Sequence, residues 1–155
     1  MPRDFPFIPG FLQALQRSPA AQEARAKLAR TIDDGKLPAR VRAQIALVVA
    51  QEGRCDYCVW AQTVVAREAG LRWEDVTLAC AGTAVDPREA AIVKLARVIA
   101  RTGTFAPNEV RSFARDPRIS AADVVEVVAN AALAVLDNYM IQALAPAAVP
   151  ARREV

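Results

Sequence analysis

Between its glycines and prolines, the chain repeatedly places apolar residues three or four positions apart, the spacing that lines one face of an α-helix. Val41, Ile45, Val48 and Val49 form one such stripe in a segment that stops at Gly53. The pattern requires no strand. We therefore predict an all-α, multi-helix bundle, and 155 residues are enough for one domain with a substantial hydrophobic core.

Local start and stop signals divide the chain into helices. Ser18 and Pro19 form one cap and first turn, and Asp86-Pro87, with Glu89 at the capping-box position, form a second. The predicted helices cover residues 18–34, 38–53, 55–69, 73–81, 86–102 and 120–144. We predict that residues 1–144 form one helical domain and that residues 145–155, rich in alanine, proline and arginine, form a flexible tail.

The chain contains no histidine, which is the commonest general base and metal ligand in proteins. Hydrolases built on Ser-His-Asp or Cys-His arrangements are therefore excluded. The formal net charge is +3, and the basic residues are spread along the chain rather than clustered. This distribution argues against a nucleic acid as partner.

The sequence predicts neither a secretion signal nor a membrane segment. The first ten residues hold three prolines and Asp4, with no continuous apolar stretch. We see no apolar run approaching the roughly 18 residues of a membrane span. The three cysteines are too few for a disulfide scaffold and odd in number, which is typical of a reducing compartment. A cytoplasmic location, with no membrane partner, is the expectation.

Four polar residues share one stripe of the last predicted helix: Asp123, Glu126, Asn130 and Asp137. Because charged side chains are mostly exposed, we interpret the stripe as a solvated edge of the helix. The alternative is a polar seam within a contact between subunits.

The segment Cys55-Asp56-Tyr57-Cys58 is a C-x-x-C motif, which has three interpretations: half of a zinc site, a redox dithiol, or two incidental core cysteines. Zinc needs four ligands, and only Cys80 remains, so no metal is expected. Cys80 itself is expected to be a small buried hydrophobic residue.

The redox interpretation has a geometric basis. Positions i and i+3 in the first turn of a helix face the same way, so Cys55 and Cys58 can approach closely enough for a disulfide. The free amides at the helix start, with Arg54 next to the first cysteine, favour a thiolate there. Tyr57 and Trp60 flank the pair and could wall an apolar pocket, although large aromatic residues belong more often to a core or an interface.

The residues from Ile45 to Thr63, followed by Ala66 and Ala69-Gly70-Leu71, resemble the core of the AhpD-like branch of the carboxymuconolactone decarboxylase family. The resemblance covers about residues 37–144, and the stretch around Tyr139 is similar to the family's last helix, where an asparagine such as Asn138 is common.

The resemblance implies an all-helical subunit that assembles into dimers, trimers or hexamers and reduces small-molecule organic hydroperoxides without a cofactor. A disulfide intermediate would be reduced again by a thiol donor. By matching position, Cys58 would attack and Cys55 would resolve. Helix polarity alone instead favours Cys55 as the more acidic thiol.

The chain departs from the family where protons are handled. Gln62 stands at the position of the family's histidine, and Ala43 and Gln51 stand at the two positions where a glutamate is found. Glutamine cannot act as a base near neutral pH, so Gln62 and Gln51 could only polarise the site. Glu52 adjoins one vacant position, but a shift of one residue turns a side chain by about 100° on a helix. We expect Glu52 to be a solvated helix end rather than a base.

The leading hypothesis is therefore a thiol-dependent peroxidase or thiol-disulfide oxidoreductase that uses the Cys55/Cys58 dithiol. Positioned acid–base groups contribute about 10²–10⁴ in rate, so we expect a slow enzyme. The alternative is a catalytically degenerate family member that acts as an oligomeric binding or structural protein. Decarboxylase chemistry has the least support, because the chain lacks histidine.

Overall fold

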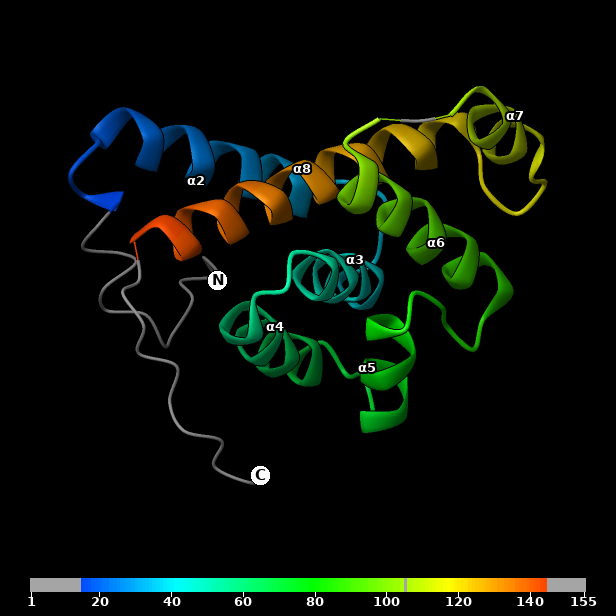
Figure 1. Ribbon diagram of the computed structural model, residues 1–155, viewed down its shortest axis with the longest axis horizontal. Helices are drawn as coiled ribbons and strands as arrows, with labels where there is room; N and C mark the ends of the chain where they lie inside the picture. The colour runs from blue at the N-terminus through cyan, green and yellow to red at the C-terminus, as the bar shows by residue number, and fades with distance from the viewer. Residues whose placement is uncertain (1–14, 105, 145–155) are drawn as a thin grey trace.

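The computed structural model describes residues 15–104 and 106–144, and within these ranges the regular structure is helical, without a strand (Figure 1). The helices are α2 (Pro19–Asp33), α3 (Ala39–Glu52), α4 (Asp56–Glu68), α5 (Trp73–Cys80), α6 (Pro87–Thr102), α7 (Pro107–Arg115) and α8 (Ala121–Leu144). The all-α prediction is confirmed. The predicted tail, residues 145–155, lies outside the described residues, as do residues 1–14 of the predicted domain.

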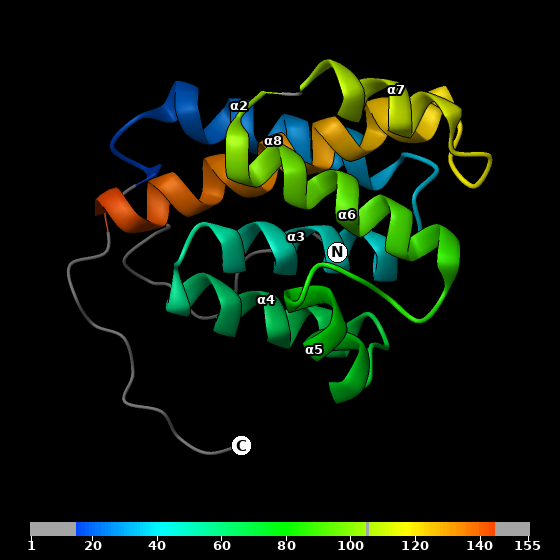
Figure 2. The ribbon, with the colours of Figure 1, turned by 45° about the vertical axis from the view of Figure 1, so that its right-hand side comes forward.

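Helix α3 lies at the centre of the molecule. It contacts α4, α5, α6 and α8, and Figure 1 shows it between α8 above and α4 and α5 below. In Figure 2, α3 and α4 run side by side beneath α6 and α8. The predicted stripe explains this position, because Val41, Ile45, Val48 and Val49 are all buried. The segment that leaves α3 therefore begins from a helix that packs against four others.

Helix α8 is a core helix with an unusually apolar sequence. By length and composition alone, residues 121–143 could cross a membrane, which the sequence analysis did not anticipate. In the fold, α8 packs against α2, α3 and α6, with Val127, Ala131 and Ala134 buried. Core helices pass the same test of length and composition, so this finding is weak support for a membrane span.

The polar stripe of α8 is paired within the subunit. Its carboxylates accept hydrogen bonds from other elements: Asp123 from Arg88, Glu126 from the backbone N–H groups of Lys36 and Leu37, and Asp137 from Arg25. Asn130 is buried and donates to the carbonyl oxygen of Glu126. The interpretation as a solvated edge was wrong, because carboxylates that are partly removed from water need such donors.

Helix α7 is an element that the prediction left out. Pro107 opens it, and the carboxylate of Glu109 accepts a hydrogen bond from the backbone N–H of Ala106 at 2.9 Å. Both residues are helix-start signals that are readable in the sequence. The helix is short and lies away from α4 in Figures 1 and 2.

Candidate active site

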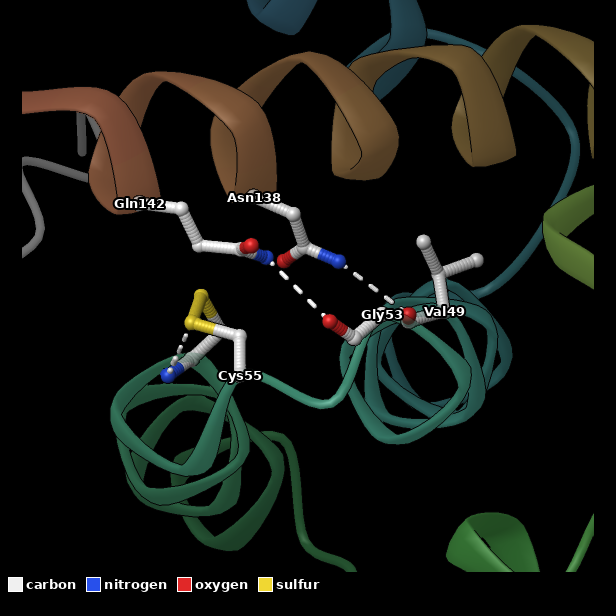
Figure 3. The surroundings of a disulfide bond; sticks show 6 residues. Val49, Gly53, Cys55, Asn138 and Gln142 are labelled. Atoms are coloured by element: carbon white, nitrogen blue, oxygen red, sulfur yellow. Dashed lines mark hydrogen bonds between the residues drawn. A yellow bond between two sulfur atoms is a disulfide. The ribbon is translucent and has the colours of Figure 1, made fainter.

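The two cysteines of the C-x-x-C motif are joined at the start of α4. Cys55 is the N-cap of this helix, and its Sγ lies 2.06 Å from that of Cys58, with 5.1 Å between the Cα atoms. The backbone N–H of Cys58 donates to the Cys55 Sγ at 3.2 Å (Figure 3). Both residues are buried, with 6% of Cys55 and 1% of Cys58 exposed. The predicted pair is thus brought together on the first turn of a helix that packs on α3.

A tight turn connects α3 to the first cysteine. The N–H of Cys55 donates to the carbonyl oxygen of Ala50 at 3.3 Å, and the N–H of Arg54 donates to that of Gln51 at 3.1 Å. These two bonds define a Schellman turn, in which the residue at the position of Arg54 adopts the left-handed conformation. Arg54 has φ = 50°. In the equivalent turn at the end of α4, the left-handed position is occupied by a glycine, Gly70. A side chain in this conformation costs about 1 kcal/mol.

Helix α8 covers the same turn with two side-chain amides. Asn138 donates from Nδ2 to the carbonyl oxygen of Val49 at 3.1 Å, and Gln142 donates from Nε2 to that of Gly53 at 3.2 Å. Figure 3 shows both side chains pointing from α8 toward this end of α3, on the side where the disulfide lies. The carbonyl oxygen of Val49 also accepts from the N–H of Gly53 at 2.9 Å, so Asn138 adds a second donor there. Gln142 supplies a donor to the carbonyl oxygen of Gly53, which lies beyond the last turn of α3.

The absence of a side chain at Gly53 leaves room for the amide of Asn138 to reach the end of α3. A Cβ on Gly53 would lie 2.8 Å from Nδ2 of Asn138. The φ of Gly53 is −72°, an ordinary value for any residue. Space for the amide of Asn138, rather than backbone conformation, therefore explains the glycine.

The disulfide lies in apolar surroundings. It shares a cluster with Leu15, Ala50 and Ile141, and partly buried side chains of Tyr57, Val59 and Met140 pack against this cluster. Burial raises the pKa of the Tyr57 hydroxyl. The rings of Tyr57 and Trp60 lie 5.6 Å apart between centroids, and the Trp60 side chain reaches the surface. Tyr57 therefore packs against the apolar cluster that holds the disulfide, and the pocket wall considered from the sequence stays a prediction.

Glu52 forms ion pairs with α6. Its carboxylate lies 2.6 Å from Nε of Arg97 and 3.7 Å from Nε of Arg101. The expectation of a solvated helix end was wrong, because the side chain is mostly covered and ties α3 to α6.

The positions that lack the family's histidine and glutamate lie in different environments. Gln62 is buried one helical turn after Cys58, so its side chain lies on the same face of α4 as that cysteine. Gln51 is exposed, and Ala43 is buried in a cluster with Leu47 and Ala66. Of these three, Gln62 alone shares a helix with the cysteines.

Cys80 lies apart from the pair, at the end of α5, as a free and partly buried thiol. Burial raises the pKa of this thiol, which keeps it protonated at neutral pH. Among the described residues, no three histidine, cysteine, aspartate or glutamate side chains come together to hold a metal ion.

Comparison with known proteins gives one family and one fold neighbour. A model of the carboxymuconolactone decarboxylase family matches residues 19–101, which include both cysteines of the pair. A crystal structure of a cysteine-to-alanine variant of the debrominase Bmp8, in complex with 2,3,4-tribromopyrrole, superposes with a TM-score of 0.74. It is 20% identical in sequence, and the match covers 87% of this chain and 73% of that chain. At this identity the likeness concerns the fold. No curated protein matches the chain.

Proposed function

The chain belongs to the carboxymuconolactone decarboxylase family, and from this premise we propose that it is a thiol-dependent reductase of small molecules, with organic hydroperoxides as the leading substrate class. The observation that carries the proposal is the placement of Cys55 and Cys58 within bonding distance at the start of a helix. Two adjacent thiols can deliver two electrons to a substrate and store the oxidation as a disulfide.

The reaction balances without a metal or an organic cofactor. One thiolate attacks a peroxide oxygen, so that an S–O bond forms, the O–O bond breaks, and the alkoxide takes a proton from water. The second thiol attacks the resulting sulfenic acid, its proton leaves with the hydroxyl group as water, and the disulfide forms. An external thiol donor then reduces the disulfide by exchange. A reducing, cytoplasmic compartment would supply such a donor.

The proposed enzyme is slow because its proton relay is incomplete. Gln62 can donate and accept hydrogen bonds but cannot exchange a proton near neutral pH. The carboxylate of Glu52 is held by Arg97 and Arg101. We therefore expect a rate about 10²–10⁴ below that of a site with positioned acid–base groups.

The incomplete relay also supports a second candidate function, an oligomeric binding or structural protein without catalysis. The structural neighbour is a debrominase, so the shared fold does not by itself select hydroperoxides over halogenated molecules. Decarboxylase chemistry retains the least support, because the chain has no histidine.

The test measures consumption of an organic hydroperoxide by reduced protein with excess dithiothreitol. The Cys80→Ser variant is the matched control, because it removes a thiol outside the pair. We expect the wild type and Cys80→Ser to turn over at the same rate, and the Cys55→Ser/Cys58→Ser variant to be inactive. A wild-type rate equal to that of the double variant would contradict the proposal. Turnover of a bromopyrrole but not of the hydroperoxide would move the substrate class to halogenated molecules.

A further inference from the structure

We propose that Cys55, the N-cap of α4, is the thiol that attacks the substrate, and that Cys58 is the thiol that resolves the intermediate. The inference rests on the proposed function and reverses the order that matching positions with the family implies. Three features of the site support it: the hydrogen bond at the start of α4, the charges around the turn, and the residues beside Cys58.

The first feature is the position of the Cys55 sulfur at the helix start. The N–H of Cys58 points at this sulfur, at 3.2 Å. The first N–H groups of a helix lack intrahelical acceptors and carry the positive end of the helix dipole, so they stabilise an anion placed there. The next N–H along the chain, that of Val59, already donates to the carbonyl oxygen of Cys55 at 2.9 Å. The start of α4 therefore favours a thiolate at Cys55.

The second feature is the distribution of charge. Arg54 directly precedes Cys55, and the Schellman turn holds it in the left-handed conformation. Among the described residues near the turn, Asp56 directly follows Cys55 and is exposed, as Arg54 is, whereas Glu52 is paired with Arg97. Helix α8 contributes uncharged side chains at this end, namely Asn138, Met140, Ile141 and Gln142. Arg54 thus adjoins the first cysteine and offsets the charge of Asp56 on its other side, which leaves the amide groups at the helix start to favour a thiolate there.

The third feature is the environment of Cys58. The family resemblance implies that a base serving an attack by Cys58 would stand one turn along α4, where this chain has Gln62. Glutamine cannot remove the thiol proton. Cys58 is also the more deeply buried of the two, with 1% exposed against 6% for Cys55. A resolving cysteine needs no such base, because it can remain a thiol until the intermediate forms.

In the assigned order, the Cys55 thiolate attacks the terminal oxygen of the hydroperoxide. The S–O bond forms, the O–O bond breaks, and the alkoxide takes a proton from water. The Cys58 sulfur then attacks the Cys55 sulfenic acid and gives up its proton as the hydroxyl group leaves as water. The hydroperoxide is the oxidant, and an external dithiol returns both cysteines to the reduced state.

The experiment compares two single variants, Cys58→Ser and Cys55→Ser, each also carrying Cys80→Ser so that one thiol remains. Each is reduced and alkylated with iodoacetamide across a range of pH. Each is also treated with one equivalent of an organic hydroperoxide in the presence of a dimedone probe for sulfenic acid. We expect the Cys58→Ser protein, which keeps Cys55, to alkylate about tenfold faster at neutral pH and to form the adduct.

The outcomes separate the inference from the proposed function. Faster alkylation and adduct formation at Cys58 would overturn the inference and leave the dithiol function standing. Absence of an adduct at either cysteine would remove the proposed function as well. If a variant fails to fold, reduced wild-type protein is treated with limiting iodoacetamide and mapped by mass spectrometry. The inference then requires that Cys55 is modified first.

Discussion

Asn138 donates a hydrogen bond from Nδ2 to the backbone carbonyl oxygen of Val49 at 3.1 Å, across 89 positions of sequence. This bond joins α8 to the last turn of α3, from which the chain passes directly into Cys55. The position of the first cysteine therefore depends on a helix that begins more than 60 residues later, at Ala121.

Replacing Gly53 with alanine should weaken this connection. The new Cβ would lie 2.8 Å from Nδ2 of Asn138, so the amide must move and lose its bond to Val49. We expect Gly53→Ala to cost about 1–2 kcal/mol of unfolding free energy, measured by urea denaturation. In an Asn138→Ala background the same change meets no amide and should cost much less. Additive effects of the two changes would contradict this coupling.

Mild oxidation of the reduced protein should give one intramolecular disulfide between Cys55 and Cys58, with Cys80 reduced. The pair shares the first turn of α4, whereas Cys80 ends α5 and burial raises the pKa of its thiol. Differential alkylation followed by mass spectrometry identifies the products. A bridge that contains Cys80 as the main product would be incompatible with the dithiol site.

The parts of the fold that the sequence predicts are those set by residues close together in the chain. The Ser18 and Asp86 caps form their expected hydrogen bonds, and the C-x-x-C spacing brings its two sulfurs together. These features depend on residues within one helical turn of each other, so local spacing is sufficient to find them.

The remaining features pair residues that are distant in sequence. Glu52 meets Arg97 across 45 positions, and Arg25 meets Asp137 across 112. No helical period links such residues, because the packing of whole helices decides which side chains meet. For this reason the prediction placed Glu52 in solvent. Asn138 could be noted only as a family feature, and its bond to Val49 became apparent in the folded chain.

Acid should remove the contribution of Asp123 to stability. Its carboxylate accepts from the backbone N–H of Ser120 at 2.7 Å and from Arg88 at 2.7 Å. The pKa of Asp123 is lowered from its ordinary 3.8. The hydrogen bond from the backbone N–H of Ser120 has the largest effect, and the other donors add to it. A carboxyl whose pKa is lower in the folded than in the unfolded state stabilises the protein when the pH is above its unfolded-state pKa. This stabilisation is lost as the pH falls through the folded-state pKa. The stability difference between wild type and Asp123→Asn should therefore be constant near neutral pH and shrink below about pH 4. A difference that grows on acidification would reverse this assignment.

The purified protein should be a homo-oligomer, as the family resemblance implies. Helix α8 exposes 68% of Val125 and 69% of Tyr139, and these residues lie 14 positions apart, close to four helical turns. Exposed apolar side chains along one side of a helix suit a contact with a second copy. Light scattering should give a multiple of 16.7 kDa, and Val125→Glu/Tyr139→Glu should reduce it. A wild-type mass of one subunit at micromolar concentration would contradict the prediction.

Arg54→Gly should separate stability from reactivity at the cysteine turn. Glycine adopts the left-handed conformation without the steric cost of a side chain, so we expect about 1 kcal/mol of added stability. The same change removes the positive charge beside Cys55, so the thiolate should form at higher pH and alkylation at neutral pH should slow. Arg54→Lys is the control, because it keeps both the charge and the conformational cost and should resemble the wild type in both measurements. Urea denaturation of the oxidised protein measures the first effect, and the pH dependence of alkylation of the reduced protein measures the second. If Arg54→Gly is more stable but alkylates as fast as the wild type, the charge of Arg54 has no part in activating Cys55, and the amide groups at the start of α4 must account for it alone.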